Sequence, residues 1–170
     1  MKTLIIFSHS YFSHSRVNKA LLETAKTVPG VTVRNLEELY GTDGSKIDVE
    51  AEQRALEGAD RVVFQFPVFW YNAPSMLKAY IDNVFTHGWA YGSKGHALVG
   101  KKFLIAASFG SPAEQYVGGE TVEKLLLPWI VAGKYVGMDV EPVFATCGAF
   151  RMPDEELEAV CESYRRTLEN

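Results

Sequence analysis

The stretch KTLIIFSHSYFSHSRVNKALL, residues 2–22, contains a strand, a loop and the start of a helix in immediate succession. Lys2–Phe7 is a nearly continuous apolar run, which predicts a strand that is covered on both faces. Arg16–Thr27 is predicted to be a helix, and Ser15 directly before it is a favourable N-cap residue. A covered strand that leads into a helix is typical of a parallel α/β sheet.

The same alternation continues to the end of the chain. Short runs of valine, isoleucine, leucine and phenylalanine are separated by helical segments, which right-handed crossovers would pack on both faces of one sheet. We therefore expect an α/β fold with a doubly wound, five-stranded parallel sheet in three α/β/α layers. The expected strands are Lys2–Phe7, Val31–Asn35, Arg61–Phe66, Lys102–Ser108 and Val140–Thr146, and the expected helices are Arg16–Thr27, Glu50–Gly58, Ser75–Phe85, Glu120–Tyr135 (kinked or split by Pro128) and Asp154–Leu168.

Size and charge narrow the function. The 170 residues suit one domain that spans the whole chain. The net charge of −4 and the lack of a basic run argue against nucleic acid and favour a small soluble ligand. No apolar run is long enough to span a bilayer and no secretory signal precedes the first strand, so we expect a cytoplasmic protein. Cys147 and Cys161 form no CxxC motif, and we expect no redox or metal role for them.

The loop after the first strand, residues 8–15, is rich in hydroxyl and imidazole groups and contains no glycine. In a doubly wound sheet the ligand lies beyond the carboxyl ends of the strands, where the start of the next helix favours an anion. Ser13, Ser15 and Asn18 would add hydrogen bonds to a phosphate, whereas a polar turn capped by Ser15 is the alternative. The Rossmann and Walker phosphate loops are excluded because both need glycines at this place.

Two further loops would meet the first at the same edge of the sheet. Residues 66–74, FPVFWYNAP, carry more aromatic side chains than a core can absorb, which favours a large flat ligand; packing under a helix or at a dimer interface is the alternative. Residues 108–116, SFGSPAEQY, combine hydroxyl groups with Gly110, which permits close approach of the backbone. A phosphate site, a flat-ring site and polar groups for a ring edge together match flavin mononucleotide (FMN).

Other combinations of residues are weaker. His87 and His96 lack a third ligand at a fixed spacing, so no metal site is predicted. Ser8 and His9 are adjacent, but the chain has no G-x-S-x-G motif and no evident carboxylate partner for them. Nucleophilic hydrolysis is therefore disfavoured.

The segments HSYFSHSRVNKALLE, AEQRALEGADRVVFQFPVFWYNAPSMLKAYIDNVFTHGWAYG and SFGS resemble the bacterial NAD(P)H:quinone oxidoreductases of the flavodoxin-like fold. The resemblance covers nearly the whole chain and is closest to the small flavoproteins that accompany glutathione-gated potassium efflux systems. It implies that the phosphate of FMN contacts His9, Ser15, Arg16, Val17 and Asn18, that the flavin ring contacts Pro67, Val68, Phe69, Trp70 and Tyr71, and that the ring edge contacts Ser108, Phe109, Gly110 and Ser111.

The resemblance also implies two catalytic tyrosines and a homodimer. Tyr91 matches an aromatic residue that reaches the substrate pocket across a dimer interface, and Tyr116 matches a tyrosine that acts with a histidine on the charge of the reduced flavin. No histidine follows Tyr116 here, so such a relay would lack its partner. Residues 108–111 also depart from the Thr-Thr-Gly-Gly common in the family, and Phe109 would alter the edge contact to the ring.

The expected function is that of an FMN-dependent oxidoreductase, with NAD(P)H as co-substrate. It would pass two electrons to a quinone or similar small acceptor by a ping-pong mechanism, and FAD is less favoured than FMN because no extension is evident to hold an adenosine. Two alternatives remain: a regulatory subunit of a glutathione-gated potassium efflux transporter, at the inner face of the membrane, and a flavodoxin-like electron carrier. The mild net charge and the exposed aromatic residues argue against the carrier.

Overall fold

The computed structural model describes the whole chain, residues 1–170. A parallel sheet forms its centre, with the strand order β2–β1–β3–β4–β5 and with β6 also paired to β4. The doubly wound parallel sheet expected from the sequence is therefore confirmed. Its strands are β1 (Thr3–Phe7), β2 (Val31–Asn35), β3 (Arg61–Pro67), β4 (Lys102–Ser108), β5 (Asp139–Val140) and β6 (Phe144–Thr146).

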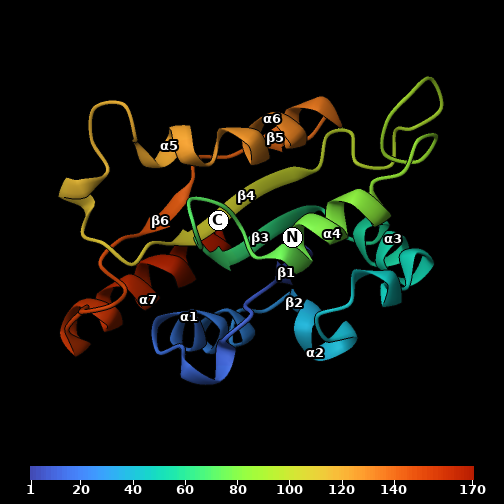
Figure 1. Cartoon of the computed structure of the whole chain (residues 1–170). Coiled ribbons are helices and arrows are strands. Elements are labelled where there is room, and N and C mark those ends of the chain that lie inside the picture. The colour runs from blue at the N-terminus through green and yellow to red at the C-terminus, as the bar shows by residue number, and fades with distance from the viewer.

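Helices cover both faces of the sheet (Figure 1). On one face α1 and α7 pack side by side, and on the other α3, α4 and α6 share the larger of two apolar clusters. The α-helices are α1 (Val17–Lys26), α2 (Leu36–Tyr40), α3 (Val49–Glu57), α4 (Ser75–Val84), α5 (Val122–Leu125), α6 (Leu127–Tyr135) and α7 (Asp154–Glu169), and the short 3-10 helices are η1 (Phe12–His14), η2 (Gly44–Lys46) and η3 (Ala113–Gln115).

The central strand β3 shows why successive residues of the strands are apolar. Every residue of β3 is buried. Val62 and Phe64 belong to the cluster under α3, α4 and α6, whereas Val63 belongs to the cluster under α1 and α7. Because successive side chains of a strand point to opposite faces, a strand that is covered twice needs a continuous apolar run.

The fifth strand is shorter than the sequence predicted. Instead of one strand over residues 140–146, β5 ends at Val140 and β6 begins at Phe144, and both pair with β4. Pro142 lies between them and has no N–H to donate to a ladder, which accounts for the interruption. The predicted break in the fourth helix is confirmed, because α5 ends at Leu125 and α6 begins at Leu127 with Pro128 in its first turn.

Two further differences concern helix starts near the first two loops. The first helix begins at Val17, one residue later than predicted, yet Ser15 still acts as a cap because its Oγ accepts a hydrogen bond from the backbone N–H of Asn18 at 3.3 Å. The short helix α2 was not predicted. Its start is capped by the side chain of Asn35, which accepts from the N–H of Glu38.

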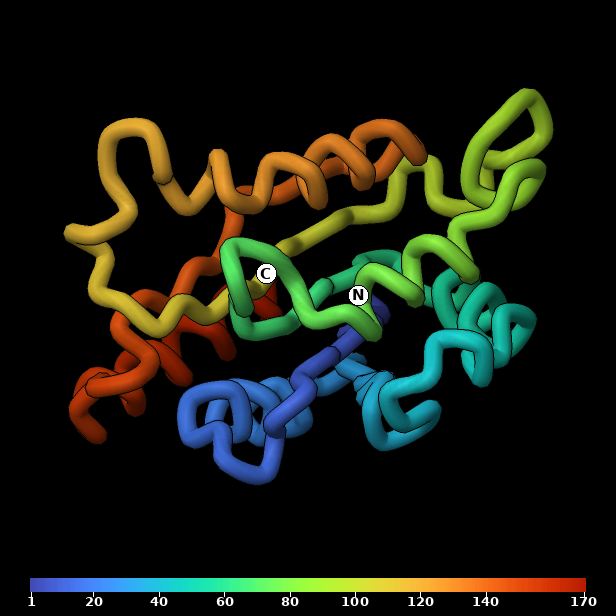
Figure 2. The backbone as a smooth tube through the Cα atoms, in the orientation of Figure 1, coloured from blue at the N-terminus to red at the C-terminus, as the bar shows by residue number.

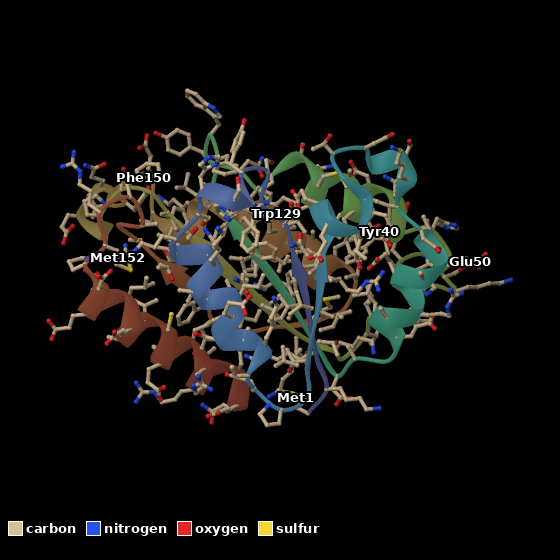
Figure 3. The ribbon with its side chains drawn as sticks, turned by 90° about the horizontal axis from the view of Figure 1, so that it is seen from below. Met1, Tyr40, Glu50, Trp129, Phe150 and Met152 are labelled. Carbon is tan, nitrogen blue, oxygen red and sulfur yellow. The ribbon has the colours of Figure 1, made fainter.

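A fully buried carboxylate joins the elements on the β2 side of the fold. Glu52 of α3 forms an ion pair with Arg34 of β2 and accepts hydrogen bonds from the hydroxyls of Tyr40, at 2.5 Å, and Tyr80, at 3.3 Å. Figure 3 shows Tyr40 and Glu50 on this side of the molecule, away from Phe150 and Met152. A buried charge is tolerated only when its oxygens are paired, as they are here.

We predict that Glu52→Ala lowers the free energy of unfolding by about 3–5 kcal/mol, because it leaves the Arg34 guanidinium without its buried partner. Glu50→Ala is the matched control. Glu50 is an exposed glutamate of the same helix, paired with Arg54 at the surface, and its loss should change the free energy by less than about 0.5 kcal/mol. Urea unfolding measures both, and equal effects of the two variants would contradict the prediction.

Candidate functional site

A cavity of about 390 Å³ lies where the loops after β1, β3, β4 and β6 meet. We call it the loop cavity. Its volume is in the range of small-molecule sites. Most of the residues predicted to bind the cofactor line it: His9, Ser15, Arg16, Val17, Asn18, Pro67, Val68, Phe69, Ser108 and Gly110.

Hydrogen bonds join the start of α1, which follows the loop after β1, to the end of β4. The Asn18 side-chain amide donates to Ser108 Oγ at 3.0 Å and to Ser15 Oγ at 3.3 Å. Asn18 and Ser108 are both buried. The floor of the loop cavity is therefore a connected set of polar groups from α1 and β4.

The start of α1 is suited to an anion. The backbone N–H groups of Arg16 and Val17 donate to no acceptor in the protein, and both residues line the loop cavity. The guanidinium of Arg16 is already engaged, because it donates to the Met152 carbonyl at 2.7 Å and pairs with Asp154 at 2.5 Å. Unpaired N–H groups and the helix dipole, rather than a side-chain cation, supply the positive potential here.

His9 is a neutral donor in this site. The imidazole is only 6% exposed and lies among the rings of Phe12 and Phe69. Burial lowers the pKa of His9 to about 4. Its Nδ1 accepts a hydrogen bond from the backbone N–H of Tyr11 at 3.1 Å, so Nε2 must carry the proton.

A second hollow of about 350 Å³ adjoins the loop cavity, with which it shares Val68, Gly110 and Phe150. We call it the aromatic pocket. Trp70, Tyr71, Tyr116 and Phe150 supply four rings to its wall, and Ser111 also lines it. Trp70 is 95% exposed and Tyr71 is 62% exposed, so neither ring is part of the core. Their exposure disagrees with packing under a helix, whereas it agrees with a ligand site and with a dimer interface, the other two interpretations offered by the sequence.

Two predicted site residues lie elsewhere. The Phe109 side chain is buried and packs against Tyr116, with ring centroids 4.9 Å apart, so it lines neither hollow. Tyr91 belongs to the segment 86–100, which projects from the end of the sheet opposite the loop after β4 (Figure 2), and its ring packs against Tyr135 of α6. Within one chain, Tyr91 therefore does not reach the site.

The sequence did not indicate Phe150, which lines both hollows and is 87% exposed. Its ring lies on Gly110, where a Cβ atom would come within 2.3 Å of the Phe150 ring. A side chain at position 110 would therefore displace the exposed Phe150 ring. The missed signal was topological: residues 147–150 follow β6, whose carboxyl end lies at the same edge of the sheet as those of β1, β3 and β4.

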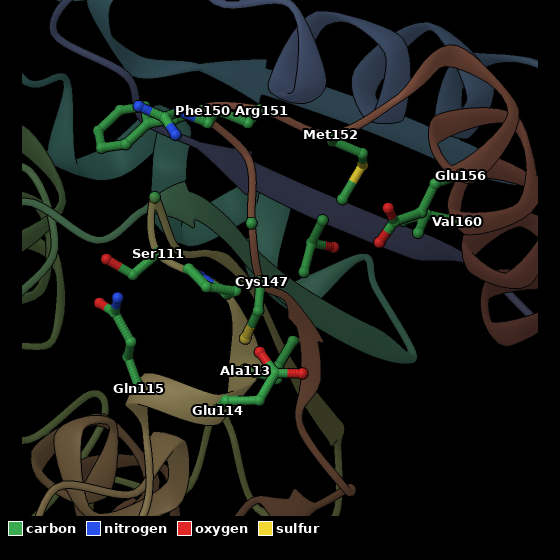
Figure 4. A pocket seen from close by; sticks show the side chains of 15 residues that line it. Ser111, Ala113, Glu114, Gln115, Cys147, Phe150, Arg151, Met152, Glu156 and Val160 are labelled. Carbon is green, nitrogen blue, oxygen red and sulfur yellow. The ribbon is translucent and has the colours of Figure 1, made fainter.

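A wider groove of about 900 Å³ lies beside these hollows and also contains Gly110 and Phe150 (Figure 4). The free thiol of Cys147 lines it near Glu114. Burial, and secondarily the Glu114 carboxylate, raise the pKa of Cys147, which keeps the thiol protonated and unreactive at neutral pH. No group of three histidine, cysteine, aspartate or glutamate side chains in the chain has the arrangement of a metal site.

Comparison with known proteins shows the family of the chain. A family model described as "Flavodoxin-like fold" matches residues 1–168. The chain belongs to this family. It is 41% identical over 167 residues to the glutathione-regulated potassium-efflux system ancillary protein KefF of Enterobacter sp. (strain 638), a match that covers 97% of this chain and 94% of that relative.

Two solved structures are similar along nearly their whole length. General stress protein 14 of Treponema denticola, in complex with FMN, has a TM-score of 0.92 and 38% identity, over 99% of this chain and 98% of that one. A protein of P. pentosaceus described as an NADPH-quinone reductase has a TM-score of 0.89 and 26% identity, over 100% and 99%. The family resemblance inferred from the sequence is confirmed.

We predict that the flavin-free protein loses stability as the pH falls from about 6.5 towards 4. An unfolded histidine, with a pKa of 6.5, takes up a proton in this range, whereas His9 in the folded protein stays neutral until about pH 4. Chemical denaturation at several pH values, with His9→Gln as the control, measures this contribution. A His9 ring that titrates near pH 6.5 by nitrogen NMR would contradict it.

Proposed function

We propose that the protein is a flavin-dependent NAD(P)H oxidoreductase, which holds FMN in the loop cavity and passes two electrons to a quinone or similar acceptor. The observation that carries the proposal is the loop cavity itself, since an anion-favouring helix start and an aromatic wall meet in one hollow. The FMN complex of general stress protein 14 and the name of the NADPH-quinone reductase support it.

The residues present fit such a cofactor at both ends. The phosphate would lie against the N–H groups of Arg16 and Val17 and the hydroxyl of Ser15. At the other end, the backbone N–H groups of Gly110 and Ser111 also donate to no acceptor in the protein. Bound FMN would supply the transfer of a hydride from NAD(P)H and of two electrons to the acceptor.

The chain's own groups would bind and orient the reactants. Pro67, Val68 and Phe69 form an apolar wall that excludes water from one side of the loop cavity. The unpaired N–H groups of Gly110 and Ser111 are preorganised donors for negative charge at the ring edge. Tyr116 presents its hydroxyl-bearing ring to the aromatic pocket without a histidine partner, so it would orient the acceptor rather than relay a proton.

The aromatic pocket is lined by four aromatic rings and adjoins the loop cavity, so nicotinamide and quinone would occupy it in turn. We therefore predict that the FMN-loaded protein oxidises NAD(P)H with menadione by a ping-pong mechanism, with parallel double-reciprocal lines. Steady-state rates at varied concentrations of both substrates check this. Intersecting lines would exclude a shared pocket, and a protein that retains no flavin and reduces no quinone would refute the proposed function.

Ser15→Asp separates helix capping from phosphate binding. Aspartate is as good a cap as serine, so the fold should persist, but its charge would face the phosphate. We predict that the affinity for FMN falls at least about tenfold, while the affinity for riboflavin, which has no phosphate, falls far less. Fluorescence titration of both flavins measures this. An equal effect on the two flavins would show that the start of α1 does not hold the phosphate.

A homodimer would bring Tyr91 to the aromatic pocket of a second copy. Two features support this arrangement: Tyr91 lies outside its own site, and α6 exposes an apolar stripe of Leu127, Val131 and Tyr135, the last in ring contact with Tyr91. An exposed apolar stripe on a helix is typical of an interface. We predict a dimer in light scattering at micromolar concentration, and a fully active monomer would refute a role for Tyr91.

The similarity to KefF favours a second candidate function. That relative is named as the ancillary protein of a glutathione-regulated potassium-efflux system, and this chain matches 94% of its length. The protein would then bind such a transporter and regulate it. None of the helices is long and apolar enough to cross a membrane. Co-purification with a potassium-efflux transporter of this class, co-expressed with the protein, tests this candidate, and failure of the pair to associate would remove it.

A further inference from the structure

Two of the four aromatic residues that line the aromatic pocket, Trp70 and Tyr71, lie in a strained turn. The backbone N–H of Phe69 donates to the Asn72 carbonyl at 2.8 Å, and the N–H of Asn72 donates back to the Phe69 carbonyl at 3.0 Å. Between them, Trp70 has a φ of +48° and Tyr71 a φ of +63°. This is the geometry of a two-residue hairpin turn that normally requires glycine, asparagine or aspartate at both central positions.

No other non-glycine residue of the chain has a positive φ. Burial does not explain the conformation, because both side chains are largely exposed and gain little from the core. A bulky residue persists in the left-handed region only when its surroundings hold it there, and such residues gather at functional sites. Here both of them line the aromatic pocket.

The surroundings that hold the turn converge on one side chain. Asn72 Oδ1 accepts hydrogen bonds from the N–H of Ala73 at 2.8 Å and from Trp129 Nε1 at 3.1 Å. Trp129 is buried in α6, and its ring packs against Phe64 and Phe66 of β3 with centroids 6.2 and 5.8 Å apart. The indole N–H of Trp129, 57 residues later in the sequence, therefore links the turn to the rigid core.

We propose that Trp129 and Asn72 form a clamp that holds the strained turn and so positions Trp70 and Tyr71 in the wall of the aromatic pocket. The inference rests on the proposed function only in naming the ligand of the aromatic pocket. Trp129 and Asn72 are positioning residues, since the strain of the turn is offset by the hydrogen bond from the core. A loosened turn would bind the flat acceptor less well, whereas the start of α1, which would hold the phosphate of the cofactor, is not part of the turn.

Trp129→Phe removes the indole N–H and keeps an aromatic ring in the core. Its matched control is Tyr164→Phe, which also removes a hydrogen-bond donor from a buried aromatic ring, the hydroxyl bonded to Gln65 Oε1 at 2.9 Å, and which lies in the apolar cluster on the opposite face of the sheet. For Trp129→Phe we expect the KM for menadione to rise about fivefold, with kcat and FMN content nearly unchanged. Tyr164→Phe should change none of them. An unchanged KM in Trp129→Phe, or an equal rise in both variants, would overturn the proposal.

A stability cycle tests the clamp without cofactor or substrate. Tyr71→Gly relieves the strain at one position and should raise Tm by about 2 °C. If the clamp serves to hold the strained turn, Trp129→Phe must lower Tm less in the Tyr71→Gly background than in the wild type. Additive shifts, or a lower Tm for Tyr71→Gly, would refute the clamp. If the Tm shifts of the two substitutions are non-additive as expected but no quinone is reduced, the clamp is supported and the proposed function is refuted.

Discussion

Parallel pairing of β3 with β1 on one side and β4 on the other is the constraint on which the rest of the structure depends. It brings the carboxyl ends of three strands to one edge, so that loops far apart in the sequence share a hollow. It also requires helices on both faces, which supply the start of α1 at that edge. The bond between Asn18 and Ser108 fixes the distance between two of these loops.

The loop cavity is polar without being strongly charged. Its one arginine is paired with Asp154, its buried histidine is neutral, and Lys19 donates to the carbonyl of Ser13. Anion binding would therefore depend on backbone N–H groups whose positions are set by the fold. Among substitutions only proline removes such a group, and salt screens fixed, partly buried dipoles less than it screens mobile surface charges.

Much of this arrangement could be predicted from the sequence, because continuous apolar runs identify strands covered twice and loop positions follow from the strand order. Phe109 differs from the other residues predicted at the ring edge, because it lines neither hollow. Ser108 is the last residue of β4 and faces Asn18, so side-chain alternation already directs Phe109 to the opposite face. Phe150 was missed because only the loops after the first, third and fourth strands were considered. The burial of Glu52 depends on partners in three other elements, which no local pattern indicates.

The position of Phe150 bears on how members of this fold diverge. Its side chain stands in solvent and belongs to neither apolar cluster, so the folding free energy depends little on its identity. The same ring, however, borders three neighbouring hollows at once. Natural selection could thus alter the size and shape of the ligand space through a single codon, at almost no cost in stability. Exposed residues after the last strand are where lineages with one scaffold are expected to acquire different substrates.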